Sequence, residues 1–339
     1  MMFRSDVCGF LLALSACSSN AAPLATQMSA PPSTQECTLA TSDRRWLDES
    51  VSAWNHALKH IAHAQAEQLT AVIFDASCTL TSETALTRGP VQWSAVRHDG
   101  FVPLPDGQSM PAQVTSFAAP ARKGAFFVMA APSIWEEGRV EGGALNLETL
   151  MTAVLLHEGS HVLQFPTYGE EMAKLSRQHG LPKSFNDDSI QSQFGANQDF
   201  AASVARETEL LFAAAAAGDL KEVRKLAREA RTMMLSRRDR WFRGKDAHLR
   251  EAEDIWLTME GSGQWLAYRW LTDPRGGGVS TAIALPAFAK RGKWWSQKQG
   301  IALFLVLERL APAGWGRQVF GGGTNKATLM LDLALTAEG

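Results

Sequence analysis

Apolar side chains recur along most of this 339-residue chain at the three- and four-residue spacing of amphipathic helices. The pattern predicts a first helix from Asp43 to Ala64 and a second from Ala201 to Ala217. It then predicts a helix from Asp219 to about Arg237, where Asp219 is the cap, and another from His248 to Leu271. The tail, 293–335, has the pattern of one or two further helices. The chain is therefore expected to be mostly helical.

The stretch from Leu69 to Ala130 departs from this spacing and has the pattern of β structure. Short strands are predicted at 72–74 and 91–93, and the strongest strand at Ala125–Ala130, with glycine, proline and aspartate turns between them. The polar stretch from Phe165 to Asn197 is expected to be a loop that either borders a substrate cleft or simply covers the surface. The predicted fold class is α+β, mostly α, with a small N-terminal β-sheet.

An apolar run from Leu147 to Leu163, preceded by the good N-cap residue Asn146, predicts a buried helix. It contains the motif H-E-x-x-H at His157, Glu158 and His161. Positions i and i+4 share one helix face, so the two imidazoles can occupy two corners of a zinc tetrahedron. The glutamate between them can reach a metal-bound water and act as a general base. The alternative is a pair of core histidines with ordinary hydrogen bonds.

The third metal ligand must come from another segment, because the residues after His161 do not continue the metzincin pattern. Glu260 and Glu207 are the two candidates. Glu207 lies in an alanine-rich helix, where an exposed acidic pair with Glu209 explains it. Glu260 lies among tryptophan, leucine and methionine residues, where burial of an unpaired carboxylate would be costly. Glu260 is therefore the predicted ligand, and Glu207 remains the rival.

Glycines accompany both segments: Gly159 lies inside the motif, and Gly261 and Gly263 flank the predicted ligand. Each costs about 1 kcal/mol inside a helix, and close approach of two helices would offset that cost. The stretch Met259–Tyr268 resembles the E-G-x-A/G segment of gluzincin-type metallopeptidases, in which a glutamate completes a site begun by H-E-x-x-H. The resemblance implies a zincin-like catalytic lobe, a Zn²⁺ ion held by two histidines and this glutamate, and a strand that holds an extended peptide.

These features predict a zinc-dependent hydrolase, a metallopeptidase whose substrate is a peptide or protein. Tyr268 is a candidate hydrogen-bond donor to the oxyanion; the alternative is a tyrosine that packs its ring in the core. A different class of function is a non-catalytic surface lipoprotein whose metal-stabilised helical core binds a partner. Glu158 favours the enzyme, because a purely structural metal site needs no general base. Hydrolysis of a non-peptide bond is a third possibility.

The N-terminus has the pattern of a lipoprotein signal peptide, residues 1–17. Its last four residues, Leu14–Cys17, resemble a bacterial lipobox, which implies a lipid on Cys17 and an anchor in the outer membrane that faces the periplasm. The alternative is cleavage near Ala21, which would give a secreted or periplasmic soluble protein. Residues 18–36 are rich in serine, alanine, proline and threonine and predict a flexible tether.

The remaining residues, 37–339, are expected to form one zincin-like metallopeptidase domain. The composition is that of a globular protein, with 45% hydrophobic and 20% charged residues. The formal net charge of −2 argues against nucleic acid as a partner. Cys37 and Cys78 are the only cysteines after Cys17, and in an oxidising compartment they are expected to form a disulfide. The alternative is two separate buried thiols.

Overall fold

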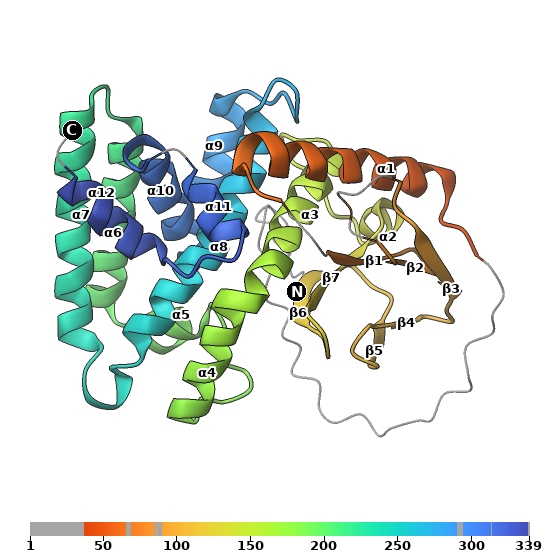
Figure 1. Cartoon of the computed structure of the whole chain (residues 1–339), viewed down its shortest axis with the longest axis horizontal. Coiled ribbons are helices and arrows are strands. Elements are labelled where there is room, and N and C mark those ends of the chain that lie inside the picture. Colours follow the sequence, from red (N-terminus) through yellow and green to blue (C-terminus); the bar gives the residue numbers. More distant parts are fainter. Residues whose placement is uncertain are drawn as a thin grey trace, which may run out of the picture.

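The computed structural model describes residues 37–65, 69–84, 86, 90–289, 294–312 and 314–337. The predicted signal peptide with Cys17 and the predicted tether, 18–36, lie outside the described residues. Figure 1 shows a β-sheet on one side of a central helix, α3 (Leu147–Gln164), and a group of helices on the other. The predicted fold class, α+β and mostly α with an N-terminal sheet, is confirmed.

Five strands form the main sheet in the order β3-β2-β1-β7-β6, with β1 and β7 parallel and the other pairs antiparallel. Their bounds are Thr70–Phe74 for β1, Cys78–Ser82 for β2, Trp93–Arg97 for β3, Ser116–Pro120 for β6 and Ala125–Ala130 for β7. A separate hairpin contains β4 (Phe101–Pro103) and β5 (Ser109–Pro111). The strongest predicted strand, β7, is fully buried and has a neighbour on each side, so the edge strand beside α3 is β6.

The helices account for most of the described chain. Besides α3, they are α1 (Thr41–His56), the π-helix η1 (Ala57–Ala62), α2 (Pro132–Glu137), the π-helix η2 (Phe165–Gly169), α4 (Glu170–His179), α5 (Ser189–Phe194), α6 (Gln198–Ala216), α7 (Leu220–Trp241), the 3-10 helix η3 (Gly244–Asp246), α8 (Leu249–Thr272), α9 (Thr281–Ala289), α10 (Trp295–Leu310), α11 (Trp315–Phe320) and α12 (Ala327–Thr336). The N-caps predicted at Asn146 and Asp219 are both present, each accepting a backbone N–H.

The prediction of a loop from Phe165 to Asn197 is wrong, because this stretch contains η2, α4 and α5. Two buried apolar residues of α4, Met172 and Leu175, pack against Ile255 and Met259 of α8. They are spaced for one helix face, but the polar residues around them hide that short pattern in the sequence. Tertiary packing rather than local propensity therefore accounts for this helix.

Helix α8 packs tightly between α3 and α10, and glycines make both contacts possible. A Cβ on Gly263 would lie 2.7 Å from Nδ1 of His157 on α3. A Cβ on Gly261 would lie 2.5 Å from the backbone of Gly300 on α10. The predicted approach of the 261–263 segment to the motif helix is therefore present through Gly263. Gly159 has a different role, since a Cβ there would meet the ring of Trp54 on α1.

The predicted disulfide between Cys37 and Cys78 is confirmed. It ties the segment before α1 to the start of β2. At the other end of the chain, α12 is held by arginines of α7: Arg231 forms an ion pair with Asp332 at 2.7 Å, and Arg228 donates to the carbonyl of Leu335. No helix within the described residues is both long enough and apolar enough to cross a membrane.

Candidate metal centre

The two motif histidines of α3 meet Glu260 of α8 in the interior of the molecule. Nε2 of His157 lies 3.0 Å from Nε2 of His161 and 3.4 Å from Oε2 of Glu260. The distance from His161 Nε2 to Glu260 Oε1 is 3.3 Å. All three residues are buried, with exposed fractions of 2%, 6% and 3%. Among the described residues, this is the one group of three or more histidine, cysteine, aspartate or glutamate side chains close enough to share a metal ion.

The spacing of these donor atoms fits a tetrahedral metal ion. Ligand bonds of about 2.0–2.1 Å at tetrahedral angles place neighbouring ligand atoms roughly 3.3 Å apart. The observed separations of 3.0, 3.3 and 3.4 Å fall on both sides of that value. Two imidazoles and one carboxylate are also a ligand set that zinc accepts in proteins. The three residues therefore fit a tetrahedrally coordinated metal ion.

A chain of hydrogen bonds fixes the ring of His161 in the tautomer that metal binding requires. Ser262 Oγ donates to the carbonyl of Met259, so it must accept from the carboxamide nitrogen of Gln164, at 2.6 Å. The carboxamide oxygen of Gln164 then faces His161 Nδ1 at 3.2 Å and accepts its proton. Nε2 of His161 is left with its lone pair pointing at the metal position, as in metal sites whose histidines are oriented by hydrogen bonds.

When no metal is bound, neighbouring charges shift the pKa values of His161 and Glu260. Burial alone would lower the pKa of His161, but the nearby Glu260 carboxylate outweighs burial and raises the pKa to about 9. Burial opposes ionisation of Glu260, yet the two imidazoles hold the pKa of its carboxyl group well below the usual range. Gln297 of α10 also donates to Glu260 Oε2, at 3.2 Å. Without a metal, the stable state is thus an imidazolium paired with a carboxylate.

Glu158 lies beside the three ligands but points to a different partner. Its Oε1 accepts a hydrogen bond from Ser116 Oγ on β6, at 3.0 Å. Burial raises the pKa of the Glu158 carboxyl group, and the charges of His157 and His161 partly oppose that effect. A carboxylate with a raised pKa next to a metal position is a better proton acceptor than an ordinary exposed carboxylate, as a general base requires.

Glu207, the rival ligand, is engaged elsewhere. It is fully buried rather than exposed as its sequence setting suggested, and it forms an ion pair with Arg237 of α7 at 2.8 Å. Gln299 of α10 donates to its second oxygen at 2.9 Å. Arg237 also pairs with Glu253 of α8, so the glutamate belongs to a buried ionic cluster that joins α6, α7 and α8. The sequence hides this pairing, because Arg237 is thirty residues away on another helix.

Tyr268, the candidate oxyanion donor, is on the same helix as Glu260 but about 12 Å further along it, since each residue rises 1.5 Å. Its ring packs edge-on against Phe288 of α9, with centroids 5.6 Å apart. This placement agrees with the packing alternative and sets the hydroxyl apart from the three ligands.

Asp187 lies in the stretch that was expected either to border a substrate cleft or to cover the surface. It precedes α5 and is 8% exposed, and its Oδ2 lies 3.4 Å from the hydroxyl of Ser296 on α10. Burial and the charges of Glu260 and Asp188 raise the pKa of its carboxyl group, which places it within electrostatic reach of the metal ligands. Asp187 therefore lies close enough to Glu260 for their charges to interact, whereas its neighbours Asn186 and Asp188 line a separate cavity.

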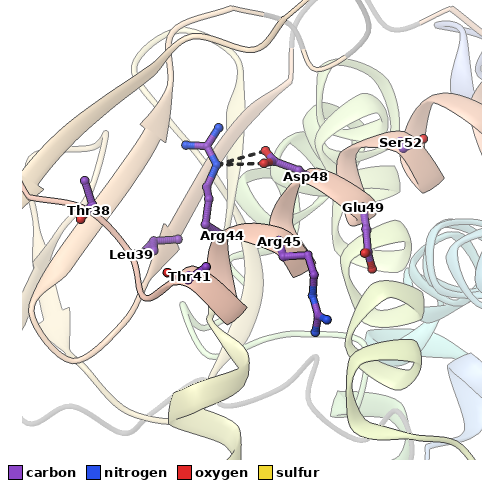
Figure 2. A pocket seen from close by; sticks show the side chains of 8 residues that line it. All are labelled: Thr38, Leu39, Thr41, Arg44, Arg45, Asp48, Glu49 and Ser52. Carbon is purple, nitrogen blue, oxygen red and sulfur yellow. Dashed lines mark hydrogen bonds and ion pairs between the residues drawn. The ribbon is translucent and has the colours of Figure 1, made fainter.

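The cavity in Figure 2 is unrelated to this chemistry. It is a shallow groove over the outer face of α1, where Arg44 reaches Asp48 in an exposed ion pair of 3.1 Å. A second cavity is lined by Asp188, His248 and Trp294 among others. None of the three metal-ligating side chains lines either cavity.

Comparisons with known proteins do not assign the chain to a family. No protein-family model matches the chain, and searches among curated proteins and solved structures found no match.

Proposed function

We propose that this protein is a zinc-dependent hydrolase that cleaves peptide bonds. One observation carries the proposal: within the described residues, His157, His161 and Glu260 form a group of three, with no fourth histidine, cysteine, aspartate or glutamate close enough to join it. Structural zinc sites are closed by four protein ligands, whereas catalytic sites have three and keep one position open. The buried carboxylate of Glu158 beside an open position supplies the general base that hydrolysis requires.

The chain's own groups can then be assigned to steps. When bound, zinc would lower the pKa of a water molecule toward about 7 and polarise the substrate carbonyl. Glu158 takes a proton from the attacking water as the oxygen–carbon bond forms, and it delivers that proton to the amine that leaves as the carbon–nitrogen bond breaks. Gln164 and Gln297 keep the ring of His161 and the carboxylate of Glu260 in place throughout.

The edge strand β6 supports the choice of a peptide as the substrate. It pairs with β7 on one side only, and both strands pack against α3, which carries the motif. The free edge of a strand offers backbone N–H and C=O groups to an extended chain, which can add to the sheet as a further strand. A peptide held along β6 would pass the end of the sheet where Ser116 contacts Glu158.

A non-catalytic role remains the second candidate, and the burial of the site favours it. With only 2%, 6% and 3% of the three ligands exposed, the metal would sit in the core, as it does in sites that only stabilise a fold. Such a lipoprotein would use its surface to bind a partner. The two functions differ in what they demand of Glu158, because only hydrolysis needs its carboxylate.

The deciding experiment compares the purified mature protein with its Glu158→Gln variant. Metal content is measured by mass spectrometry of the ions, and activity on a mixed peptide library is followed by mass measurement of the products. We expect about one zinc ion per chain in both proteins. The wild type should cleave peptides, and the variant should lose most of that activity. Zinc retained without any cleavage would favour the stabilising role, and unchanged cleavage by Glu158→Gln would contradict the general base.

A further inference from the structure

Ser116 and Glu158 form a buried contact between the sheet and the motif helix. The hydroxyl of Ser116 donates to Glu158 Oε1 at 3.0 Å, and the two residues are 2% and 1% exposed. Buried side chains exchange their hydrogen bonds with water for hydrogen bonds within the protein, and a bond to a charged acceptor is among the stronger ones. The contact therefore fixes one oxygen of this carboxylate.

The local fold gives Ser116 little freedom. It is the first residue of β6 and pairs with Met129 of β7, while the carbonyl of the preceding Thr115 accepts the N–H of Ala130. Both strands pack on α3, so the distance between the Ser116 backbone and the Glu158 backbone is set by the sheet. A short side chain with one rotatable hydroxyl is then held at hydrogen-bond distance from the carboxylate.

We propose that Ser116 is a positioning residue for Glu158 in the hydrolytic reaction, an inference that rests on the proposed function. The terminal torsion of a glutamate has a broad energy profile, so an unrestrained carboxylate samples many orientations. A general base must lie about 2.6–3.2 Å from the proton that it removes. By holding Oε1, the hydroxyl of Ser116 turns Oε2 toward the water, so that Ser116 acts on the reaction through Glu158.

The test uses two alanine variants that each remove a buried serine hydroxyl hydrogen-bonded to a side chain of α3. Ser116→Ala removes the hydroxyl that contacts Glu158. Ser50→Ala is the matched control, because Ser50 is equally buried and shares a hydrogen bond of 2.9 Å with Thr152 on α3, five residues before His157. Zinc content, thermal unfolding midpoint, kcat and KM on one cleaved peptide are measured for both. Ser116→Thr, which keeps a hydroxyl, is the rescue variant.

We expect Ser116→Ala to lower kcat roughly 10–100-fold, the range found for partners that orient a site from its second layer, with KM and zinc content unchanged. Ser116→Thr should recover most of the loss. Ser50→Ala should retain the wild-type kcat even where it lowers the unfolding midpoint as much as Ser116→Ala. In the Glu158→Gln background, Ser116→Ala should cause no further loss, because the group that it positions is already inactive.

A readout independent of turnover is the infrared carboxylate band of Glu158, obtained as the difference between wild type and Glu158→Gln in the metal-free protein. Loss of the Ser116 hydrogen bond should shift that band, and Ser50→Ala should not. Equal kcat in Ser116→Ala and wild type, or equal losses in the two alanine variants, would overturn the role of Ser116 while hydrolysis stands. If zinc-loaded wild type cleaves no peptide, the proposed function and this role fail together.

Discussion

Gly261 of α8 faces Gly300 of α10 so closely that a Cβ on Gly261 would lie 2.5 Å from the Gly300 backbone. The next residue toward the N-terminus of α8 is the candidate metal ligand Glu260. We therefore expect Gly261→Ala to push α8 away from α10, destabilise the protein and weaken zinc binding. Overpacking of this kind typically costs 1–3 kcal/mol. Denaturant unfolding and zinc titration measure the two effects.

Gly218→Ala is the control for that substitution, because nothing lies within 4 Å of a Cβ added at Gly218. It should leave both the stability and the zinc affinity near the wild-type values. A Gly261→Ala protein as stable as the control would show that the two helices adjust to the added methyl group without strain.

The two buried glutamates should behave differently on truncation. Glu260→Ala removes a ligand, so the folded variant should lose zinc. Glu207→Ala should keep zinc but lose roughly 3–5 kcal/mol of stability, because Arg237 would be left buried with part of its charge uncompensated. Zinc content and urea unfolding, measured on the same samples, separate the cases. Zinc lost from Glu207→Ala and retained by Glu260→Ala would reverse the assignment.

The metal-free protein should lose stability as the pH rises from about 6.5 to about 9. The folded pKa of His161 is raised to about 9 from the ordinary histidine value of 6.5, so the folded state binds a proton more tightly than the unfolded chain. Its stabilisation is complete below the unfolded pKa and disappears as the pH passes the folded one. Urea unfolding at pH 6, 7.5 and 9 tests this. The slope should be smaller in His161→Gln, in which the raised pKa values of Glu158 and Asp187 still contribute.

Reduction of the disulfide should destabilise the protein measurably. Closing a loop of 41 residues contributes roughly 3–4 kcal/mol through the entropy of the unfolded chain. The double variant Cys37→Ser/Cys78→Ser should show this loss in denaturant unfolding, with zinc content unchanged because neither cysteine is near the ligands. Two free thiols in native protein, found by alkylation and mass measurement, would contradict the disulfide.

The location of the protein is tested separately through Cys17. If the lipobox is used, wild-type protein should fractionate with the membrane, and Cys17→Ala should release it. The mature N-terminus should carry a lipid mass in the first case and none in the second. Wild-type protein found in the soluble fraction would favour simple cleavage and a periplasmic or secreted protein.

The parts of the site that are local in sequence were predictable. The spacing of His157 and His161 on one apolar helix and the burial expected at Glu260 were enough to select the residues that the fold brings together. The buried setting of Glu207 was not predictable, because Arg237, which compensates its charge, comes from a different helix. The contact of Ser116 with Glu158 was not predictable either. Ser116 lies on β6, a short strand whose position at the edge of the sheet is set by pairing rather than by its own residues.

The fold, like the site, was predictable where the pattern is local in sequence. Strong apolar periodicity located α3, α6, α7 and α8 to within a few residues. Helix α4 was missed because its two buried residues contact α8, far along the chain, and contribute too little local pattern. Tyr268 was a reasonable oxyanion candidate by composition alone, yet rotation and rise along α8 carry it to the contact with Phe288.

The metal ligands also connect distant parts of the chain. Two of them lie on the helix next to the sheet and the third lies about 100 residues later among the other helices. A bound ion would therefore act as a reversible cross-link, closing a loop longer than that of the disulfide. Because the unfolded chain lacks this arrangement, the free energy of metal binding adds to that of folding. Metal supply in the compartment would then set how long the chain survives the proteases around it.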